Sequence, residues 1–315
     1  MVDTAPYDVG IVGYGPAGIT AAIYAARKQL RVVLIGAVPG GEVVNSGDIE
    51  NWPGGGETDG LKLSDGFVRH LDLHADVVTR VTKTVTKITR AGQTGDFTLY
   101  CDDEVVYLAR TVIYAAGRHP RELGVPGEVE FKNKGVSYCA TCDAPLFPEK
   151  DVAVIGGGNT GAEAVIMFQK IARRIYLLHI DGKLRADPIL VKNFADDPNV
   201  SIIFNAKTTA IKGDKMVNAL TYEDALNRKE KTLSVQGVFI TIGAIPNTEP
   251  VKSFVELDAF GAIAADRYGA TNVPGFFAAG DVTDIRDAQI VVAAGHGCSA
   301  ALSAGDYLSR RSAAS

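Results

Sequence analysis

Residues 7–18, YDVGIVGYGPAG, decide the fold of the first part of this chain. Tyr7–Val12 is a short apolar run that predicts a buried strand, and a GxGxxG pattern follows it. An Ala-rich stretch from about Pro16 to Lys28 predicts a helix, and Arg31–Ile35 predicts the next strand. This order of strand, glycine loop, helix and strand is typical of a dinucleotide-binding α/β domain.

The glycine loop itself predicts a contact with a diphosphate. Gly13 permits the tight turn, Gly15 lets the backbone approach the phosphates, and Gly18 lets helix and strand pack closely. The start of the following helix adds N–H donors and positive potential. The cofactor-binding candidates of this loop are Gly13, Gly15, Pro16, Ala17 and Gly18.

The acid that usually binds the ribose is missing from the end of the second strand, which reads Ile35-Gly36. The nearest acidic residue is Glu42, six positions further on. Glu42 is therefore included among the cofactor-binding candidates.

The same order of strand, glycine loop, helix and strand occurs a second time. Strands are expected at 151–155 and 175–179, with a helix at 159–171 between them, and residues 156–161 read GGGNTG. We expect a second nucleotide-binding fold here. Its candidate ligand residues are Gly156, Gly158, Asn159, Thr160 and Gly161.

Asp181 lies 20 residues after Gly161, at the end of the second strand of this unit. An acid there accepts a hydrogen bond from a ribose 2′-hydroxyl and repels a 2′-phosphate, which favours NAD(H) over NADP(H). Arg185 is the nearby cation suited to a 2′-phosphate. The alternative interpretation is a solvated turn, Asp181-Gly182-Lys183, with no role in binding.

These patterns predict an α/β fold with two Rossmann-like three-layer nucleotide-binding domains, the second inserted in the first. The expected boundaries are 1–117, 118–245 and 246–315, because the strand at 238–242 mirrors the strand at 112–116 and residues 243–247 resemble a crossing linker. Residues 77–107 alternate β-branched and polar side chains, which predicts a small antiparallel sheet.

Between the two glycine loops lies Cys139-Ala140-Thr141-Cys142, followed by Asp143. Two thiols at this spacing close a small disulfide ring, so one sulfur can attack an external disulfide and the other can resolve it. The Asp143 carboxyl is placed to exchange protons with these sulfurs. The alternatives are two buried thiols or half of a zinc site. Zinc needs two more ligands, and the spacing of His296 and Cys298 is not typical of zinc, so no metal is expected.

Composition narrows the class of protein. The chain has 315 residues, with 32 basic and 37 acidic side chains and a net charge of −5, which argues against nucleic-acid binding. The first residues do not resemble a signal peptide, and no run of 18 apolar residues occurs. We expect a cytoplasmic protein with no membrane partner.

With these pieces placed, the chain resembles the low-molecular-weight thioredoxin reductases along its whole length. The resemblance implies an FAD domain formed by both ends of the chain, an inserted domain of the pyridine-nucleotide type that carries the CxxC, and a homodimer. The matching stretches are Gly13–Arg27, Glu50–Gly54, Tyr138–Asp143, Gly156–Glu163, Ala278–Asp284 and Gly295–Ala301.

The resemblance also implies roles for particular residues. Electrons would pass from FAD to the Cys139–Cys142 disulfide and then to thioredoxin. Cys142 would lie nearer the flavin, Cys139 would attack thioredoxin, and Asp143 would be the acid/base. Gly280 and Asp281 are similar to the family's flavin ribityl site. The remaining predicted cofactor-binding residues are Asn51, Gly117, Gln289 and Ile290.

Two departures from the family pattern concern the electron donor. NADPH users of this family carry His-Arg-Arg after the second strand of the inserted domain, whereas this chain has HIDGKLR at 179–185. Losing two phosphate contacts and gaining an acid disfavours NADPH. Ala288-Gln289-Ile290 replaces the common Arg-Gln-Ala, as in thioredoxin reductases that do not use NADPH. We therefore expect another donor. Ferredoxin or another protein is narrowly favoured, and NADH, which Asp181 favours, is the alternative.

Three other functions fit the sequence less well. A dithiol oxidase of the same fold uses FAD and oxygen, but it is expected to have a His where Asp143 stands. A flavin-binding redox sensor without turnover would leave the CxxC-Asp group unexplained. A peroxiredoxin reductase with a fused thioredoxin-like domain is set aside on chain length.

Overall fold

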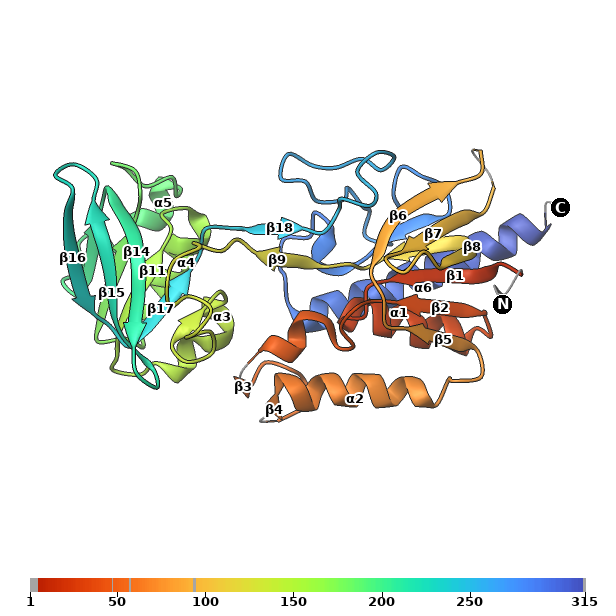
Figure 1. The fold of residues 1–315 in the computed structure, drawn as a ribbon, viewed down its shortest axis with the longest axis horizontal. Coiled ribbons are helices and arrows are strands. Elements are labelled where there is room, and N and C mark those ends of the chain that lie inside the picture. The colour runs from red at the N-terminus through yellow and green to blue at the C-terminus, as the bar shows by residue number, and fades with distance from the viewer. Residues whose placement is uncertain (1–4, 47, 57, 93–94, 314–315) are drawn as a thin grey trace. The chain divides into compact units, whose positions relative to one another are not determined.

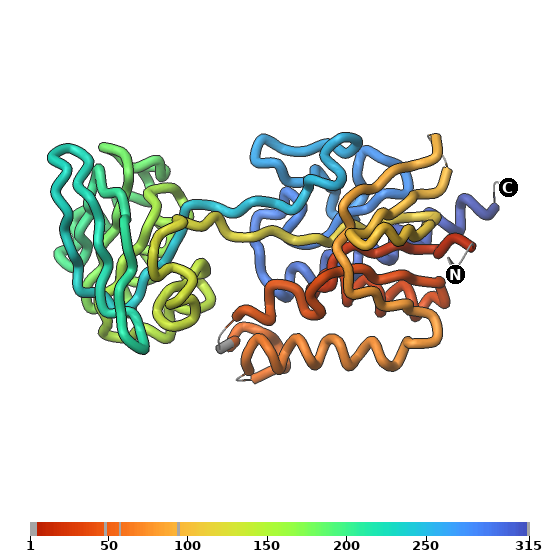
Figure 2. Tube along the Cα trace, in the orientation of Figure 1, coloured from red at the N-terminus to blue at the C-terminus, as the bar shows by residue number. Residues whose placement is uncertain are grey.

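The computed structural model describes residues 5–46, 48–56, 58–92 and 95–313. They form two compact units, one made of Met1–His119 with Ile245–Ser315 and the other of Pro120–Ala244. The first unit therefore contains both ends of the colour gradient in Figure 2. Among the described residues, no helix combines the length and the apolar character that a membrane crossing requires.

The first unit is built on a seven-stranded sheet, in which six strands follow the order β5-β2-β1-β8-β7-β6 (Figure 1). The seventh strand, β19, pairs in parallel with β8. β1 pairs in parallel with β2 and β8, and β2 pairs in parallel with β5. The strands of this unit are β1 (Tyr7–Val12), β2 (Val32–Ile35), β3 (Asp48–Ile49), β4 (Thr58–Asp59), β5 (Val78–Val81), β6 (Val85–Arg90), β7 (Phe97–Cys101), β8 (Val106–Tyr114) and β19 (Phe276–Ala278). Its helices are α1 (Pro16–Arg27), η1 (Gly41–Asn45), α2 (Gly60–Asp72), η3 (Gly280–Val282) and α6 (Ile290–Ala313).

Both faces of this sheet are covered, as its apolar central strands require. Val9 and Ile11 of β1 share one core with α1, α2 and α6. Val33 and Ile35 of β2 share the other core with β6, β7 and β8. These two cores hold the strand ends that carry the first glycine loop.

The antiparallel sheet expected over 77–107 is confirmed for β6 and β7, but these strands belong to the main sheet, and β5 does not pair with them. β5 joins the parallel part of the main sheet because Val78 packs into the same core as Val32 and Leu71. β6 and β7 extend this same sheet as antiparallel neighbours of β8.

The second unit contains a five-stranded parallel sheet with the order β10-β17-β11-β12-β13 and a three-stranded antiparallel sheet, β14-β15-β16. One core lies between the two sheets, and another lies between the parallel sheet and α4. The strands are β10 (Val136–Ser137), β11 (Asp151–Ile155), β12 (Arg174–Leu178), β13 (Val200–Ile203), β14 (Ala206–Gly213), β15 (Val217–Asp224), β16 (Lys229–Ser234) and β17 (Gly237–Ile240). The helices are α3 (Ala140–Asp143), η2 (Ala144–Leu146), α4 (Asn159–Phe168) and α5 (Pro188–Val191).

The chain crosses between the units along two segments that pair with each other, β9 (Arg118–Pro120) and β18 (Ala244–Pro246). Asn247 fastens the second crossing to the first. Its backbone N–H donates to the Gly117 carbonyl at 3.0 Å, and its side-chain amide donates to the Ala116 carbonyl at 2.8 Å. Tyr114 donates its hydroxyl proton to the Asn247 carbonyl at 2.7 Å.

Candidate functional site

The first glycine loop, between β1 and α1, has the shape that a diphosphate needs. Gly13 has φ +116°, and a Cβ there would lie 2.0 Å from the Ala115 carbonyl oxygen. A Cβ on Gly18 would lie 1.8 Å from the Gly13 carbonyl oxygen. Gly15 is the N-cap of α1, with no side-chain cap of its own. The turn and the helix packing therefore exclude side chains, and the start of a helix presents backbone N–H groups that suit an anionic ligand.

Glu42, isolated in the sequence, lies at the start of η1 directly after Gly41. This segment returns to the loop, because the Gly40 N–H donates to the Tyr14 carbonyl at 2.8 Å and a Cβ on Gly41 would lie 2.7 Å from Gly15 Cα. Gly40 and Gly41, which both have positive φ, therefore bring the Glu42 backbone close to the glycine loop. The acidic residue that follows β2 in the sequence is thus brought near the glycine loop through a turn.

The C-terminal segment supplies the other side of this site. A Cβ on Gly280 would lie 2.9 Å from Ala17 Cβ, so the backbone of η3 approaches α1 closely. Arg118 Nε lies 3.8 Å from Asp281 Oδ2. Burial raises the pKa of Asp281, and the positive charge of Arg118 opposes this rise. Arg118 was not predicted, because nothing in its local sequence indicates a partner so far along the chain.

Two further candidates meet although 238 positions separate them. Asn51 Nδ2 donates to Gln289 Oε1 at 3.2 Å. Ile290 begins α6 and, like Trp52, packs against a small core that includes Val43. Gly117 has φ +65° and lies at the first crossing segment. The predicted residues of the first site thus all lie in the first unit.

The second glycine loop, between β11 and α4, repeats the geometry of the first. Gly156 has φ +124°, and a Cβ there would lie 2.5 Å from the Thr241 carbonyl oxygen. A Cβ on Gly161 would lie 1.8 Å from the Gly156 carbonyl oxygen. A Cβ on Gly158, the N-cap of α4, would meet nothing within 4 Å, which leaves an open cradle at the helix start.

Asp181 and Arg185 form an ion pair with each other, from the Arg185 guanidinium to Asp181 Oδ2. His179 Nε2 lies 3.5 Å from the same Asp181 oxygen. Burial lowers the pKa of His179, while Asp181 raises it and Arg185 lowers it further. The three side chains therefore form one cluster at the end of β12.

The loop after β12 is tied to the glycine loop at two places. The N–H groups of Arg185 and Ala186 both donate to the Gly157 carbonyl, at 2.7 and 3.0 Å. The Asn159 amide donates to Asp187 Oδ2 at 3.0 Å, and the Asp187 N–H donates to Asn159 Oδ1 at 2.8 Å. Asn159 is thus engaged within the protein, while Thr160 beside it is exposed.

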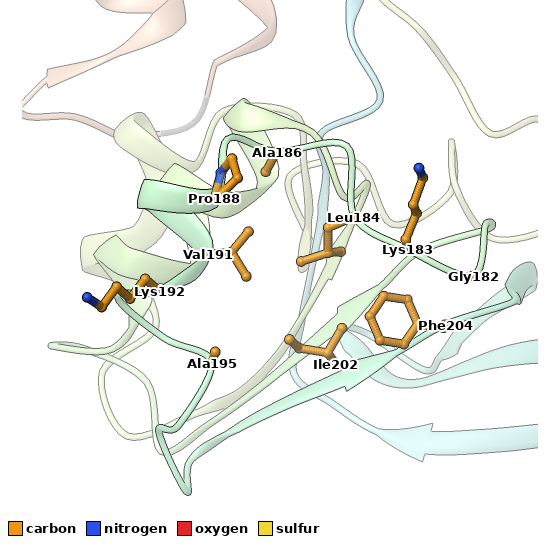
Figure 3. A pocket seen from close by; sticks show the side chains of 10 residues that line it. All are labelled: Gly182, Lys183, Leu184, Ala186, Pro188, Val191, Lys192, Ala195, Ile202 and Phe204. Carbon is orange, nitrogen blue, oxygen red and sulfur yellow. The ribbon is translucent and has the colours of Figure 1, made fainter.

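A pocket of about 470 Å³ adjoins this loop (Figure 3). Its walls are apolar side chains from the loop, α5 and the end of β13, and Lys183 and Lys192 extend at opposite ends of it. No residue of the glycine loop lines it, so we do not assign the dinucleotide to it. The lining residues are Gly182, Lys183, Leu184, Ala186, Pro188, Val191, Lys192, Ala195, Ile202 and Phe204.

Cys139 and Cys142 form a disulfide, with a Cα–Cα distance of 5.3 Å. Cys139 caps α3 and is half-buried, whereas Cys142 is exposed. The Cys142 N–H donates to Cys139 Sγ at 3.2 Å, and the Asp143 N–H donates to the Cys139 carbonyl at 3.1 Å. Asp143 thus lies one turn of helix beyond Cys139.

The residues before the disulfide are anchored by contacts that sequence reasoning missed. Ser137 is buried, and its Oγ accepts the Cys139 N–H at 3.0 Å. Tyr138 donates its hydroxyl proton to the buried carboxylate of Glu128 at 2.8 Å. Burial raises the pKa of Tyr138, and the Glu128 carboxylate raises it further. A Glu ten positions before Tyr138 carries no local signal that would identify this contact.

The sequence matches a known protein family over most of its length. The family model for pyridine nucleotide-disulphide oxidoreductases matches residues 7–297. The chain belongs to this family. Membership implies FAD and a nicotinamide nucleotide, and the two glycine loops fit such groups because each leaves bare backbone at a helix start. Among the described residues, no group of three or more His, Cys, Asp or Glu side chains is placed to hold a metal ion.

Curated relatives are longer than this chain. It is 44% identical over 311 residues to a Bacillus subtilis protein named NADH dehydrogenase, and the match covers 98% of this chain and 60% of that protein. It is also 44% identical to an alkyl hydroperoxide reductase component of Pseudomonas aeruginosa, with 98% of this chain and 59% of that protein covered. The chain therefore spans about three fifths of the length of these two relatives.

Among solved structures, the thioredoxin reductase of Streptococcus pyogenes superposes with a TM-score of 0.91 at 35% identity. The match covers 98% of this chain and 100% of that chain. The thioredoxin reductase of Giardia duodenalis gives a TM-score of 0.89 at 31% identity, covering 97% and 100%. These matches confirm the predicted α/β fold with two Rossmann-like nucleotide-binding domains and the resemblance to low-molecular-weight thioredoxin reductases.

Proposed function

We propose that this chain is an FAD-dependent disulfide reductase that takes electrons from NADH and delivers them, through Cys139 and Cys142, to the disulfide of a thioredoxin-type protein. The observation that carries the proposal is the Cys139–Cys142 disulfide beside Asp143, in a family of nucleotide-dependent disulfide oxidoreductases. We assign FAD to the domain formed by residues 1–117 and 246–315, and the nicotinamide nucleotide to residues 118–245.

Bound FAD, once NADH has reduced it, would supply the electron pair that converts the Cys139–Cys142 disulfide to the dithiol. The Cys139 thiolate then attacks one sulfur of the partner's disulfide, and the partner's other sulfur leaves as a thiolate. The Cys142 thiolate next attacks Cys139 Sγ, which releases the partner's second sulfur and restores the disulfide. Each partner sulfur takes up one proton, and we assign the delivery to the Asp143 carboxyl.

The choice of Cys139 as the attacking sulfur has a physical basis. The Cys142 N–H donates to Cys139 Sγ at 3.2 Å, and such a donor stabilises negative charge on that sulfur once the disulfide is reduced. Ser137 holds the Cys139 backbone from the other side. The Cys139→Ser variant is expected to lose transfer to the partner and to keep a flavin that the donor still reduces.

NADH replaces the protein donor that the sequence narrowly favoured. Asp181 holds the Arg185 guanidinium, so the cation best placed for a 2′-phosphate is already engaged. The open cradle at Gly158 retains the shape for a diphosphate. The name of the Bacillus subtilis relative, NADH dehydrogenase, adds support.

Anaerobic stopped-flow mixing of the oxidised, FAD-loaded protein with NADH, NADPH or reduced ferredoxin tests the donor. We expect NADH to bleach the flavin fastest. Asp181→Ser should narrow the preference for NADH over NADPH by roughly tenfold or more, because one unit charge at contact distance contributes about 1–4 kcal/mol near a protein surface. Rapid bleaching by NADPH or ferredoxin, with none by NADH, would contradict this assignment.

The similarity to the alkyl hydroperoxide reductase component of Pseudomonas aeruginosa favours a second acceptor, a disulfide protein that serves hydroperoxide reduction. Reoxidation of the reduced enzyme by thioredoxin and by such a protein, compared under the same conditions, separates the two acceptors. Peroxide formation from a small dithiol and oxygen, without reductase activity, would instead indicate a dithiol oxidase. The expected homodimer is tested by light scattering of the FAD-loaded protein.

A further inference from the structure

His179 is a buried histidine that the proposed electron transfer does not use. Only 6% of its surface is exposed, and it lies between the second glycine loop and the Asp181–Arg185 ion pair. Its Nδ1 accepts the Gly157 N–H at 3.1 Å. Its Nε2 is buried, with Asp181 Oδ2 at 3.5 Å and no hydrogen-bond partner at closer range among the described residues.

The contact with Gly157 fixes the state of the ring. Nδ1 can accept a proton donor only through its lone pair, so the neutral ring must carry its hydrogen on Nε2. That hydrogen faces the Asp181 carboxylate. One ring therefore contacts the glycine loop with one nitrogen and faces the ribose-binding candidate with the other.

Gly157 is the point at which three segments meet. Its carbonyl accepts the N–H groups of Arg185 and Ala186, and its own N–H is held by His179. A Cβ on Gly157 would lie 2.7 Å from both His179 Cγ and Leu184 Cδ2. This glycine, absent from the predicted site, is required because the imidazole packs directly on the loop.

We propose that His179 is a positioning residue for the second nucleotide site. Its neutral ring holds the Gly157 peptide and thereby the glycine loop that receives the diphosphate. A second proton on the ring releases this loop. The proposal rests on the proposed use of NADH. A doubly protonated ring has a donor at Nδ1, which opposes the Gly157 N–H and breaks the contact.

The groups around the ring make the neutral form dominant. Burial lowers the pKa of His179 below the ordinary value of 6.5. Asp181 opposes this effect and Arg185 adds to it, and these are the charged groups that act on the ring. Two backbone groups also act on the ring: the Gly157 N–H donates to it, and a hydrogen bond with the Lys183 backbone raises its pKa. Neither backbone group titrates. The backbone of His179 itself pairs with Ile203 and Ala206. Nucleotide affinity should therefore fall on the acid side of neutrality.

Two variants distinguish the roles of His179 Nδ1 and Nε2. His179→Asn places an amide oxygen near the Nδ1 position and keeps an acceptor for Gly157. His179→Gln places its amide near the Nε2 position and loses that acceptor. His70→Asn, at an exposed histidine of α2, is the matched control.

The first measurement does not depend on NADH. Nitrogen-15 NMR of histidine-labelled, FAD-loaded protein, assigned with His179→Asn, reports the ring tautomer, and hydrogen exchange reports the Gly157 amide. We expect the Nε2–H form at neutral pH, and Gly157 protection that disappears as His179 titrates. The Nδ1–H form, or protection that does not follow the titration, would overturn the proposal.

The second measurement is the affinity for NAD⁺, which does not reduce the flavin, between mildly acid and neutral pH. We expect binding by the wild type and His70→Asn to weaken as His179 takes up a proton, and binding by His179→Asn to lose this dependence. His179→Gln should bind about tenfold more weakly throughout, the effect of one lost hydrogen bond. The same acid dependence in His179→Asn as in the wild type would overturn the proposal. No binding at any pH, with the NMR result as expected, would refute NADH as the donor and leave the role of His179 in the loop supported.

Discussion

Removing the carboxylate of Glu128 should loosen the segment that leads into the dithiol. This side chain is 1% exposed and accepts hydrogen bonds from two parts of the chain. The successive N–H groups of residues 123–125 donate to it at 2.9, 2.7 and 3.3 Å, and the Tyr138 hydroxyl donates at 2.8 Å. Glu128→Ala leaves all of these donors without this acceptor.

The size of the effect follows from the burial of the carboxylate. A buried donor left without its acceptor costs about 1–3 kcal/mol, and Glu128→Ala leaves several such donors, so the cost should exceed that of losing one hydrogen bond. Tyr138→Phe removes a single hydrogen bond to a charged group, which contributes about 1.5–3 kcal/mol. The double variant should be less destabilised than the sum of the two, since both single changes remove the same Tyr138–Glu128 contact.

Native-state hydrogen exchange of the amides at 123–125 measures the free energy of local opening in the FAD-loaded chain. It is preferred to tryptophan fluorescence because Trp52, the single tryptophan, lies in the other unit. Glu130→Ala, an exposed carboxylate two positions on, is the control and should leave exchange unchanged. Unchanged protection in Glu128→Ala, or strict additivity in the double variant, would refute the reasoning.

Gly156→Ala should destabilise the chain by about 1–3 kcal/mol or more in urea unfolding, because it combines a strained φ of +124° with a contact of 2.5 Å to the Thr241 carbonyl. Asp143→Asn should slow reoxidation of the dithiol by thioredoxin by about 10²–10⁴-fold in stopped flow, with reduction by NADH unaffected. Cys101 is buried, and burial raises its pKa to about 11, so maleimide should label it at neutral pH only after unfolding. Burial lowers the pKa of His296 in the folded protein. Below the ordinary pKa of 6.5 the unfolded state therefore binds more protons than the folded state, and the free energy of unfolding should fall as the pH drops from 6.5. Urea unfolding over this pH range should show a smaller fall in His296→Asn.

Local sequence patterns predicted the elements whose conformation is decided by residues close together in the sequence. Both glycine loops and their flanking strands and helices were predictable, because a turn with positive φ and a buried helix start leave a periodic signature within about 20 residues. Glu42 was found only as an isolated acid, since the return of its segment depends on the packing of Gly41 against Gly15. His179 and Gly157 form a contact across 22 positions that no spacing rule describes. The parallel pairing of β5 was missed because it is decided by a core shared with α2.

The division of the first unit between the two ends of the chain has a consequence for the order of folding. The second unit is continuous, from Pro120 to Ala244, so a ribosome releases all of its strands before β19 and α6 exist. The glycine loop at 13–18 must wait for Gly280 and α6, which are synthesised after the whole second unit, before its surroundings are complete. The dithiol unit can therefore fold while the nascent first unit still lacks its final strand. The first site is therefore completed only after the whole second unit has been synthesised.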